Sequence, residues 1–359
     1  MRITITLSFF LVGIGQLLAQ CPTGPFTLTT QAEVNSFATD YPGCTMIPDG
    51  ADLEISGASI TDLTPLQQLT GSLAAFEIRD CPNLTNLSGL ENITVIGNDA
   101  LDGFILRDLP SLTSIAALNN LASITGEFTI RTCGQLTNLT GLNNLIDVNG
   151  SVIIRDNSSL ESFSGLNALN YIGETLEIVE NPLLIDISAL SNVDTIIGGL
   201  EGGVFIEDNA ILSTLNGLGN SDTIIGGNLD LILNANLSVC AVPSICNYLD
   251  NPPVGAVITI NSNLTDCNSE MEITDSCATL SIYEAEVSAS TLKIYPTSFD
   301  NNLTIVSNKE TELTLWSING QKESFNINLG HNEIDLSHLS SGLYFIGTIK
   351  GKIFKILKN

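Results

Sequence analysis

The sequence predicts a mainly β protein, built as a right-handed parallel β solenoid with capped ends and followed by a small β-sandwich. Three observations support this prediction. A segment of about 24 residues repeats along most of the chain. Within each repeat, the apolar residues first alternate and then recur at every third position. The last part of the chain lacks this repeat and consists of short alternating stretches separated by turns.

The repeat is defined by one column of apolar residues that occupy the same place in successive turns. They are Ile55, Ile78, Leu106, Ile130, Ile154, Ile178, Ile206 and Leu231. The intervals between them are 23, 28, 24, 24, 24, 28 and 25 residues. A nearly fixed period of this length is typical of a solenoid. The two longer turns carry insertions at 98–102 and 199–203, which we expect to form loops at one edge.

Each turn combines a strand with flat segments joined by corners. Phe128 and Ile130 alternate with Thr129 and Arg131, which is the period of two that a β-strand requires. The next apolar residues are spaced by three: Leu136, Leu139, Leu142, Leu145 and Val148. An α-helix would spread these residues around most of its circumference. The spacing therefore favours straight segments that keep all of them inside.

The corners of the turns carry small residues and amides in columns. The small residues are Gly89, Ala117, Gly141, Gly165, Ala189 and Gly217. The amides are Asn92, Asn120, Asn144, Asn192 and Asn220. Because asparagine side chains can satisfy backbone groups in turns, we expect the amide column to bond the backbone of stacked coils.

The start of the chain has the features of an export signal. Arg2 is followed by a short apolar segment and then by polar sequence, so residues 1–20 are interpreted as a signal peptide. Cys21 would also permit a lipoprotein signal, although Gln20 is a poor residue before a lipid-bearing cysteine. No later stretch approaches the ~20 apolar residues of a membrane helix, and no transmembrane segment is expected.

Both ends of the solenoid, which spans 53–237, need caps. The first cap is expected at 21–52, with a helix and a Cys21–Cys44 disulfide. The second is a Cys-rich segment at 238–279. Its preferred pairs are Cys240–Cys267 and Cys246–Cys277, and the other two pairings of these cysteines stay open.

Two further cysteines, Cys81 and Cys133, lie inside the repeats. They are two turns apart, about 9–10 Å at the spacing of a sheet, and a disulfide needs Cα atoms within ~7 Å. We therefore expect them to be buried thiols that pack as small apolar residues.

The repeats resemble known modules. The segment "LTNLTGLNNLIDVNGSVIIRDNSSL" (136–160) resembles the receptor L-domain-like coils of many exported Bacteroidetes proteins. The segment "LEIVENPLL" (176–184) also resembles the core of a leucine-rich repeat. The L-domain form is preferred, because the period-three stretch leaves no room for the helix of an ordinary leucine-rich repeat. The resemblance implies a binding or adhesion module and names no ligand.

A linker at 280–290 precedes a tail at 291–359 that resembles the type A C-terminal sorting domain of the type IX secretion system. The motifs are "IYPTSFDNNLTI" (294–305), "LWSINGQ" (315–321) and "NEIDLSHLSSGLYFIGTIKGK" (332–352). The residues singled out in them are Tyr295, Pro296, Asn319, Gly320, Gly342 and Tyr344. One departure is Thr297-Ser298 after the proline, where the family usually has Asn-Pro. The resemblance implies as partners the type IX machinery and its sortase-like peptidase, and a product at the cell surface or outside the cell.

The charge distribution excludes some functions. Residues 21–286 carry 33 Asp and Glu against four Arg, which argues against nucleic-acid binding. The two histidines, His331 and His338, lie in the tail, so the solenoid cannot hold a Ser/His/Asp or Cys/His device. Its carboxylates scatter over turns without a dense cluster or a metal-binding motif. We expect no enzyme, no metal and no cofactor.

The basic residues of the solenoid form one column: Arg79, Arg107, Arg131 and Arg155. Stacked ~4.8 Å apart, two such charges repel by roughly 1 kcal/mol even in water, so something must compensate them. The favoured interpretation is that Asp80, Asp108 and Asp156, next in sequence, and the nearby Glu77 neutralise the column. The alternative is a ligand site, in which Ile105, Thr129, Ile153 and Phe205 add an apolar strip to guanidinium groups that hold carboxylates or sulfates.

The sequence therefore predicts a non-catalytic cell-surface or secreted binding or adhesion protein, with a glycan or a protein as ligand. Two alternatives remain. A polysaccharide-degrading enzyme on the same solenoid would need carboxylates about 5–10 Å apart in a groove. A structural surface-coat protein would self-associate instead of binding a selective ligand.

Overall fold

The computed structural model describes residues 21–97, 103–199, 202–219, 224, 226–278, 293–295, 298–299, 301–307, 310–317, 321–347 and 353–359. The chain divides into two compact units, the first ending at Cys277 and the second beginning at Ala278. The expected signal peptide at 1–20 and linker at 280–290 lie outside the described residues. Within the described part, no helix has both the length and the apolarity to span a membrane.

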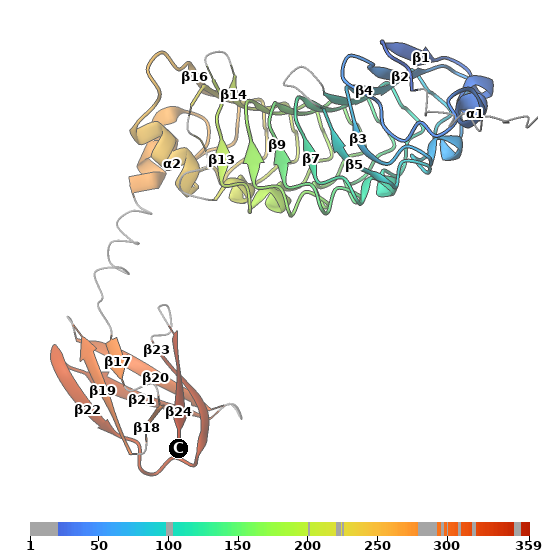
Figure 1. The fold of residues 1–359 in the computed structure, drawn as a ribbon. Helices are drawn as coiled ribbons and strands as arrows, with labels where there is room; N and C mark the ends of the chain where they lie inside the picture. The colour runs from blue at the N-terminus through green and yellow to red at the C-terminus, as the bar shows by residue number, and fades with distance from the viewer. Residues whose placement is uncertain are drawn as a thin grey trace, which may run out of the picture. The chain divides into compact units, whose positions relative to one another are not determined.

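The first unit is built on two parallel sheets (Figure 1). The long sheet has ten strands in chain order: β1 (Phe26–Leu28), β2 (Leu53–Ser56), β4 (Phe76–Arg79), β6 (Phe104–Arg107), β8 (Phe128–Arg131), β10 (Val152–Arg155), β12 (Leu176–Val179), β14 (Gly203–Glu207), β15 (Asn228–Ile232) and β16 (Ile258–Asn261). The short sheet has six: β3 (Gly71–Leu73), β5 (Ile93–Ile96), β7 (Ser123–Ile124), β9 (Asp147–Val148), β11 (Tyr171–Ile172) and β13 (Thr195–Ile196). Successive coils thus stack strand on strand, which confirms the long parallel sheets and is consistent with the predicted parallel solenoid.

The register of the long sheet follows the apolar column of the sequence. Ile130 pairs with Ile154, and the same pairing links every member from Ile55 to Leu231. The structure adds one strand at each end, because Leu28 pairs with Ile55 and Leu231 pairs with Ile260. These two strands, β1 and β16, lie within the segments expected to be caps, so each cap also extends the sheet.

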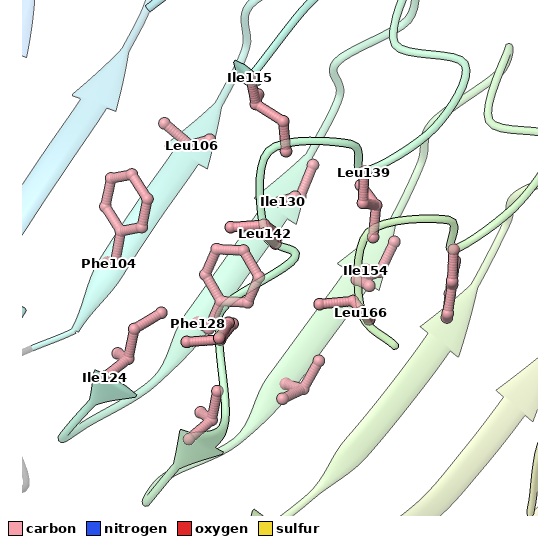
Figure 2. Close-up of a cluster of buried hydrophobic side chains, with 14 of the residues drawn as sticks. Phe104, Leu106, Ile115, Ile124, Phe128, Ile130, Leu139, Leu142, Ile154 and Leu166 are labelled. Carbon is pink, nitrogen blue, oxygen red and sulfur yellow. The ribbon is translucent and has the colours of Figure 1, made fainter. Parts of the chain in front are cut away.

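The interior between the sheets is filled by apolar side chains (Figure 2). The period-three residues from Leu136 to Val148 are all buried, at 0–1% exposure. Phe76, Phe104 and Phe128 stack from coil to coil, with ring centroids 5.5 and 5.8 Å apart. The corner glycines allow this close stacking. Gly141 has φ +127°, and a Cβ atom there would meet the backbone of Ile115 in the preceding coil.

The corners take two forms. Short 3-10 turns occur at η1 (Thr64–Leu66), η2 (Ala116–Leu118), η3 (Ser188–Leu190) and η4 (Asn216–Leu218). Positive-φ glycines occupy the equivalent place at Gly89, Gly141 and Gly165. The expected amide column bonds the preceding coil, since Asn120 and Asn144 donate to the carbonyls of Glu91 and Asn119, each at 2.7 Å. Asn220 lies outside the described residues.

A second amide column is buried, and sequence reasoning missed it. Its members Asn157, Asn181, Asn209 and Asn234 are fully buried, at 0% exposure. Asn181 shows the pattern. Its Nδ2 donates to the carbonyl of Ile154 at 2.9 Å, and its Oδ1 accepts from the backbone N–H of Asn157 at 3.3 Å. Its Nδ2 also donates to Oδ1 of Asn209 in the next coil at 3.4 Å. Each side chain therefore ties its own coil to both neighbours, and no buried polar group of the ladder lacks a partner among the described residues.

Cys81 and Cys133 are free and buried, and they occupy the same column as the buried asparagines. The Sγ of Cys133 lies 3.8 Å from the carbonyl oxygen of Leu106, one coil earlier. Burial raises the pKa of Cys133 to about 12. Both thiols are therefore favoured in the neutral form in the core.

The caps close both ends of the core. The first contains α1 (Gln31–Asp40), which begins with a capping box between Thr30 and Glu33 and buries Val34 and Phe37. It carries the Cys21–Cys44 disulfide, so Cys21 serves as a structural cysteine. The second contains α2 (Pro243–Asp250) and a helical segment at 270–278. Its disulfides are Cys240–Cys267 and Cys246–Cys277, which coincide with the preferred pairings.

The second unit contains two β-sheets. One orders β17 (Lys293–Tyr295), β19 (Asn302–Ser307) and β22 (Gly330–Asp335), all antiparallel. The other orders β18 (Ser298–Phe299), β24 (Ile353–Lys358), β23 (Gly342–Gly347), β20 (Thr311–Ser317) and β21 (Lys322–Ile327). Leu303 and Ile305 of the first sheet share one buried cluster with Leu315 and Ile346 of the second, which gives the small β-sandwich its core.

Candidate functional site: the outer face of the long sheet

The outer face is the surface formed by the outward-pointing residues of strands β2 to β15. It consists of two columns. The first contains Glu54, Glu77, Ile105, Thr129, Ile153, Glu177, Phe205 and Asp230, and the second contains Ser56, Arg79, Arg107, Arg131, Arg155, Val179, Glu207 and Ile232. The four arginines are direct neighbours in register, so the ladder expected from the repeat is present on consecutive strands.

Arg79 is surrounded by three carboxylates. Its Nη2 lies 2.6 Å from Oε1 of Glu54, its Nη1 lies 2.6 Å from Oδ2 of Asp80, and its Nε lies 3.6 Å from Oε1 of Glu77. The Asp80 hydrogen bond raises the pKa of Arg79, and the charges of Glu54 and Glu77 add to this effect. This end of the ladder is therefore compensated by its own neighbours.

The next three arginines have fewer partners. Arg107 donates from Nε to Glu77 at 2.6 Å. Arg155 bonds Asp156 through Nε at 3.2 Å and Glu177 through Nη1 at 2.8 Å. Arg131 has a single ion pair, from Nε to Asp156 at 3.0 Å, and its side chain is 52% exposed. Among the described residues, nothing bonds the two terminal nitrogens of Arg131.

The ion pairs correspond to the interpretation favoured from the sequence, in which the column neutralises itself. Six carboxylates contact the four guanidinium groups, namely Glu54, Glu77, Asp80, Asp108, Asp156 and Glu177. Because all of these groups are partly exposed, each pair contributes at most about 1 kcal/mol. The network therefore relieves repulsion within the ladder without being a large source of stability.

The backbone explains why an aspartate follows most of the arginines. Asp80, Asp108 and Asp156 have φ of 51°, 54° and 59°. This left-handed conformation is one that aspartate tolerates better than most residues. The turn therefore favours aspartate at these positions, and this also places a negative charge beside each of the arginines.

The apolar neighbours are only partly available. Ile105, Ile153 and Phe205 are half-buried on the outer face. Thr129 is 6% exposed, although it points outward, and its hydroxyl donates to Glu127. The apolar strip beside the arginines is therefore interrupted at β8. Its accessible apolar residues are Ile105, Ile153 and Phe205.

Beyond the arginines the outer face becomes acidic. Glu177, Glu207 and Asp230 lie on the consecutive strands β12, β14 and β15. Burial raises the pKa of Glu207, and the charges of Asp230 and Glu177 raise it further. Oδ1 of Asp230 is buried and has no hydrogen-bond partner among the described residues. This acidic end was not recognised from the sequence, although Glu177, Glu207 and Asp230 all fall at outward positions of the repeat.

A separate acidic groove follows the left-handed turn residues. It has a volume of about 340 Å³ and is lined by Asp156, Ser158, Glu180, Pro182 and Asp208. A hydrogen bond between Asp156 and Glu180 lowers the pKa of Asp156 and raises the pKa of Glu180. No set of three or more possible metal ligands occurs in the part of the chain that the structure describes.

The sorting motif is partly described. Gly342 and Tyr344 lie in β23, where Gly342 has φ +156° and the hydroxyl of Tyr344 donates to the carbonyl of Ser340 at 2.9 Å. Tyr295 lies in β17. Pro296, Asn319 and Gly320 lie outside the described residues.

Comparison with known proteins identifies the tail. Residues 293–358 match the family described as the secretion system C-terminal sorting domain. No curated protein and no solved structure shows significant similarity to the chain. The matched domain is the sorting signal of the type IX secretion system, so the protein is exported to the cell surface or the extracellular space. It also interacts with the type IX machinery on the way.

Proposed function

We propose that the first unit is a non-catalytic binding or adhesion module of the L-domain-like kind, which acts at the cell surface or after release. Two observations support the proposal. The tail directs export, and the solenoid presents a long regular face to the outside. The described return segments between β2 and β15 contain only 3-10 turns and short strands. An ordinary leucine-rich repeat would have helices there, so the L-domain form agrees better with these coils.

One observation carries the choice of site. Arg131 presents two terminal nitrogens that no described residue bonds, and it lies on the outer face next to Arg107 and Arg155 at the spacing of a sheet. A guanidinium in this state can hold a carboxylate or sulfate through two parallel hydrogen bonds. The half-buried Ile105, Ile153 and Phe205 offer apolar contact beside it. A glycan or protein ligand with acidic groups fits this combination.

The test is a binding screen against acidic glycans, neutral glycans and extracellular-matrix proteins, with residues 21–359 as the probe. A variant with Arg79, Arg107, Arg131 and Arg155 changed to Gln is screened beside it. The matched control is Arg131→Lys, which keeps the charge but loses the planar fork. We expect selective binding by the parent, a partial loss with the lysine, and a loss of more than about tenfold with the glutamines.

If the glutamine variant still binds the ligand, the arginines are not part of the ligand site. A complete lack of binding in the parent would contradict the binding function itself. Because the ion pairs are partly exposed, the folded state should survive the substitutions, and a thermal unfolding curve of each variant checks this before the screen is interpreted.

The alternative of a polysaccharide-degrading enzyme has one observation in its favour. The Asp156–Glu180 pair has pKa values moved in opposite directions and lines a groove, which is how acid and base carboxylates are often set apart. However, Glu180 is exposed and its shift comes mainly from the neighbouring carboxyl group. Release of reducing ends from acidic or neutral polysaccharides by the parent, lost in Glu180→Gln, would favour the enzyme over the binding module.

A further inference from the structure

The charges of the outer face are separated along the solenoid. The arginines occupy four consecutive strands from β4 to β10, and the carboxylates of Glu177, Glu207 and Asp230 occupy the next three, from β12 to β15. Figure 1 shows these strands side by side along one sheet. The face therefore has a half that bears the arginines and their paired carboxylates, called the basic half below, and an acidic half in line with it.

The acidic half lacks cations of its own. Glu207 and Asp230 have no ion pair among the described residues, and one buried oxygen of Asp230 has no hydrogen-bond partner there. Burial raises the pKa of Glu207, and the neighbouring charges of Asp230 and Glu177 raise it further. A positive group placed over β14 and β15 would offset the repulsion among these carboxylates.

The basic half has donors to spare. Within the described part of the chain, Arg131 bonds through its Nε alone, and Arg107 makes one short ion pair, from Nε to Glu77. By contrast, Arg79 already has three carboxylates. Among the described residues, the accessible unused donors thus lie on β6 and β8, toward the middle of the face, because the unbonded Nε of Arg79 on β4 is buried.

We propose that the outer face binds a second copy of this chain, packed face to face with its solenoid running in the opposite direction. A two-fold axis parallel to the strands, between β10 and β12, maps β8 onto β14 and β6 onto β15. Arg131 of each copy then lies opposite Glu207 of the other, and Arg107 lies diagonally opposite Asp230. The half-buried Phe205 comes to lie over Thr129 of the second copy.

The same two-fold rotation also accounts for β4, β10 and β12, whose charged residues are already paired within one chain. It maps β10 onto β12, so Arg155 and Glu177, which are already paired within one chain at 2.8 Å, form a cluster of four alternating charges on the axis. It maps β4 onto β16, whose outward residues Thr259 and Asn261 are uncharged, opposite the already compensated Arg79. The interface is isologous, so the assembly closes as a dimer.

The size of the face sets the expected strength. Eight strands ~4.8 Å apart, with four residues of ~3.3 Å each, give roughly 500 Å² per copy. Interfaces that bury roughly twice this area in total are typical of weak and transient complexes. We therefore expect a dimer that dissociates at low micromolar concentration and weakens with added salt, because its contacts are ionic.

The experiment is sedimentation equilibrium of residues 21–359 from low to high micromolar concentration, with four proteins in parallel. The parent should dimerise. Arg131→Glu and Glu207→Arg should each weaken the dimer by at least about tenfold, because each places like charges together twice across the axis. The double variant, with both changes, should recover the parent's affinity to within about threefold, since the exchanged charges again face each other.

Glu161→Arg is the matched control, because Glu161 is exposed and has no described ion pair, and it should dimerise as the parent does. A parent that stays monomeric at every concentration would overturn the proposal. So would single variants that dimerise normally, or a folded double variant that does not recover. If Glu207→Arg fails to fold, the salt dependence of the parent and the pair Glu207→Gln and Arg131→Gln decide the matter.

This inference goes beyond the proposed function, because it needs no external ligand. Glu207→Arg also separates the two ideas, since it removes the dimer and keeps all four arginines. If this variant still binds a ligand, the ligand site is supported, whether or not the parent dimerises. If the parent dimerises but binds no ligand, only the dimer is supported.

Discussion

Cys133 and Asn157 occupy the same position in successive coils, and the backbone N–H of Cys133 donates to Oδ1 of Asn157 at 3.0 Å. The pair marks a boundary in the core. On the C-terminal side of it, the buried column is made of asparagines that bond one another. On the N-terminal side, the same column contains Leu109 and two thiols, Cys81 and Cys133.

Replacing Asn181 by Ala should destabilise the fold strongly. The change leaves the backbone N–H of Asn157 and the carbonyl of Ile154 buried without these partners. Each such group costs about 1–3 kcal/mol, so we expect the free energy of unfolding to fall by about 3 kcal/mol or more. Urea denaturation measures this. Asn144→Ala, at the exposed amide column, is the control and should cost under about 1 kcal/mol; an equal loss in both variants would contradict the special role of the buried ladder.

The two thiols should not react in the folded protein. Both are fully buried, and burial raises the pKa of Cys81 and brings that of Cys133 to about 12. At pH 8 roughly one Cys133 in ten thousand would be ionised, and the reagent could not reach it. A disulfide-exchange dye should therefore detect no thiol in native protein and two after unfolding without reductant. Rapid labelling of the native form would show that these coils open readily.

Glu180→Gln should stabilise the protein at neutral pH. The hydrogen bond with Asp156 raises the pKa of Glu180, so the folded state favours the protonated form and loses stability as pH rises through that pKa. The amide of Gln can donate to Asp156 at every pH. The melting temperature of the variant should exceed that of the parent at pH 7, and the difference should shrink below the ordinary value of 4.5. Glu161→Gln removes the same charge at an exposed site and should show no such pH dependence.

Export should depend on the packed core of the tail. Ile346 is fully buried, while Leu329 is 68% exposed. Ile346→Asp buries an unpaired carboxylate, which costs several kcal/mol and should unfold this small sandwich. We expect the variant to remain inside the cell, as judged by antibody detection at the surface and in the medium. Leu329→Asp introduces the same group at the surface and should be exported normally. If both variants are exported equally, the secretion machinery does not require the folded tail.

Much of the solenoid could be predicted because its residues repeat. Ile55 to Leu231 form one column in both the sequence and the sheet, since a coil of constant length must place equivalent residues in register. Strands β1 and β16 were missed because Phe26–Leu28 and Ile258–Asn261 lie in cap segments where the period is lost. The short apolar stretches there gave no further signal.

The outer face was predicted only in part. The arginine ladder follows directly from the repeat, but the acidic half does not, because Glu177, Glu207 and Asp230 alternate between the two outward columns. The buried asparagines were also overlooked. Asn157, Asn181, Asn209 and Asn234 are spaced like the apolar column, and that shared spacing is the signal that could have revealed them. An amide next to a turn suggests exposure, and only the stacked coils supply enough partners to bury it.

The uneven amide ladder has a consequence for how the molecule comes apart. In a solenoid each coil contacts only its neighbours, so unfolding can begin at one end and proceed coil by coil. From Asn157 to Asn263, every step must break buried amide bonds that span adjacent coils. The coils before Cys133 have no such buried amide brace among the described residues. They are joined by the sheet, by apolar stacking, by exposed asparagine bonds such as Asn120 to Glu91, and by the Cys21–Cys44 bond. Under tension or protease attack outside the cell, the solenoid should therefore unfold from its amino-terminal side and keep its carboxy-terminal coils longest.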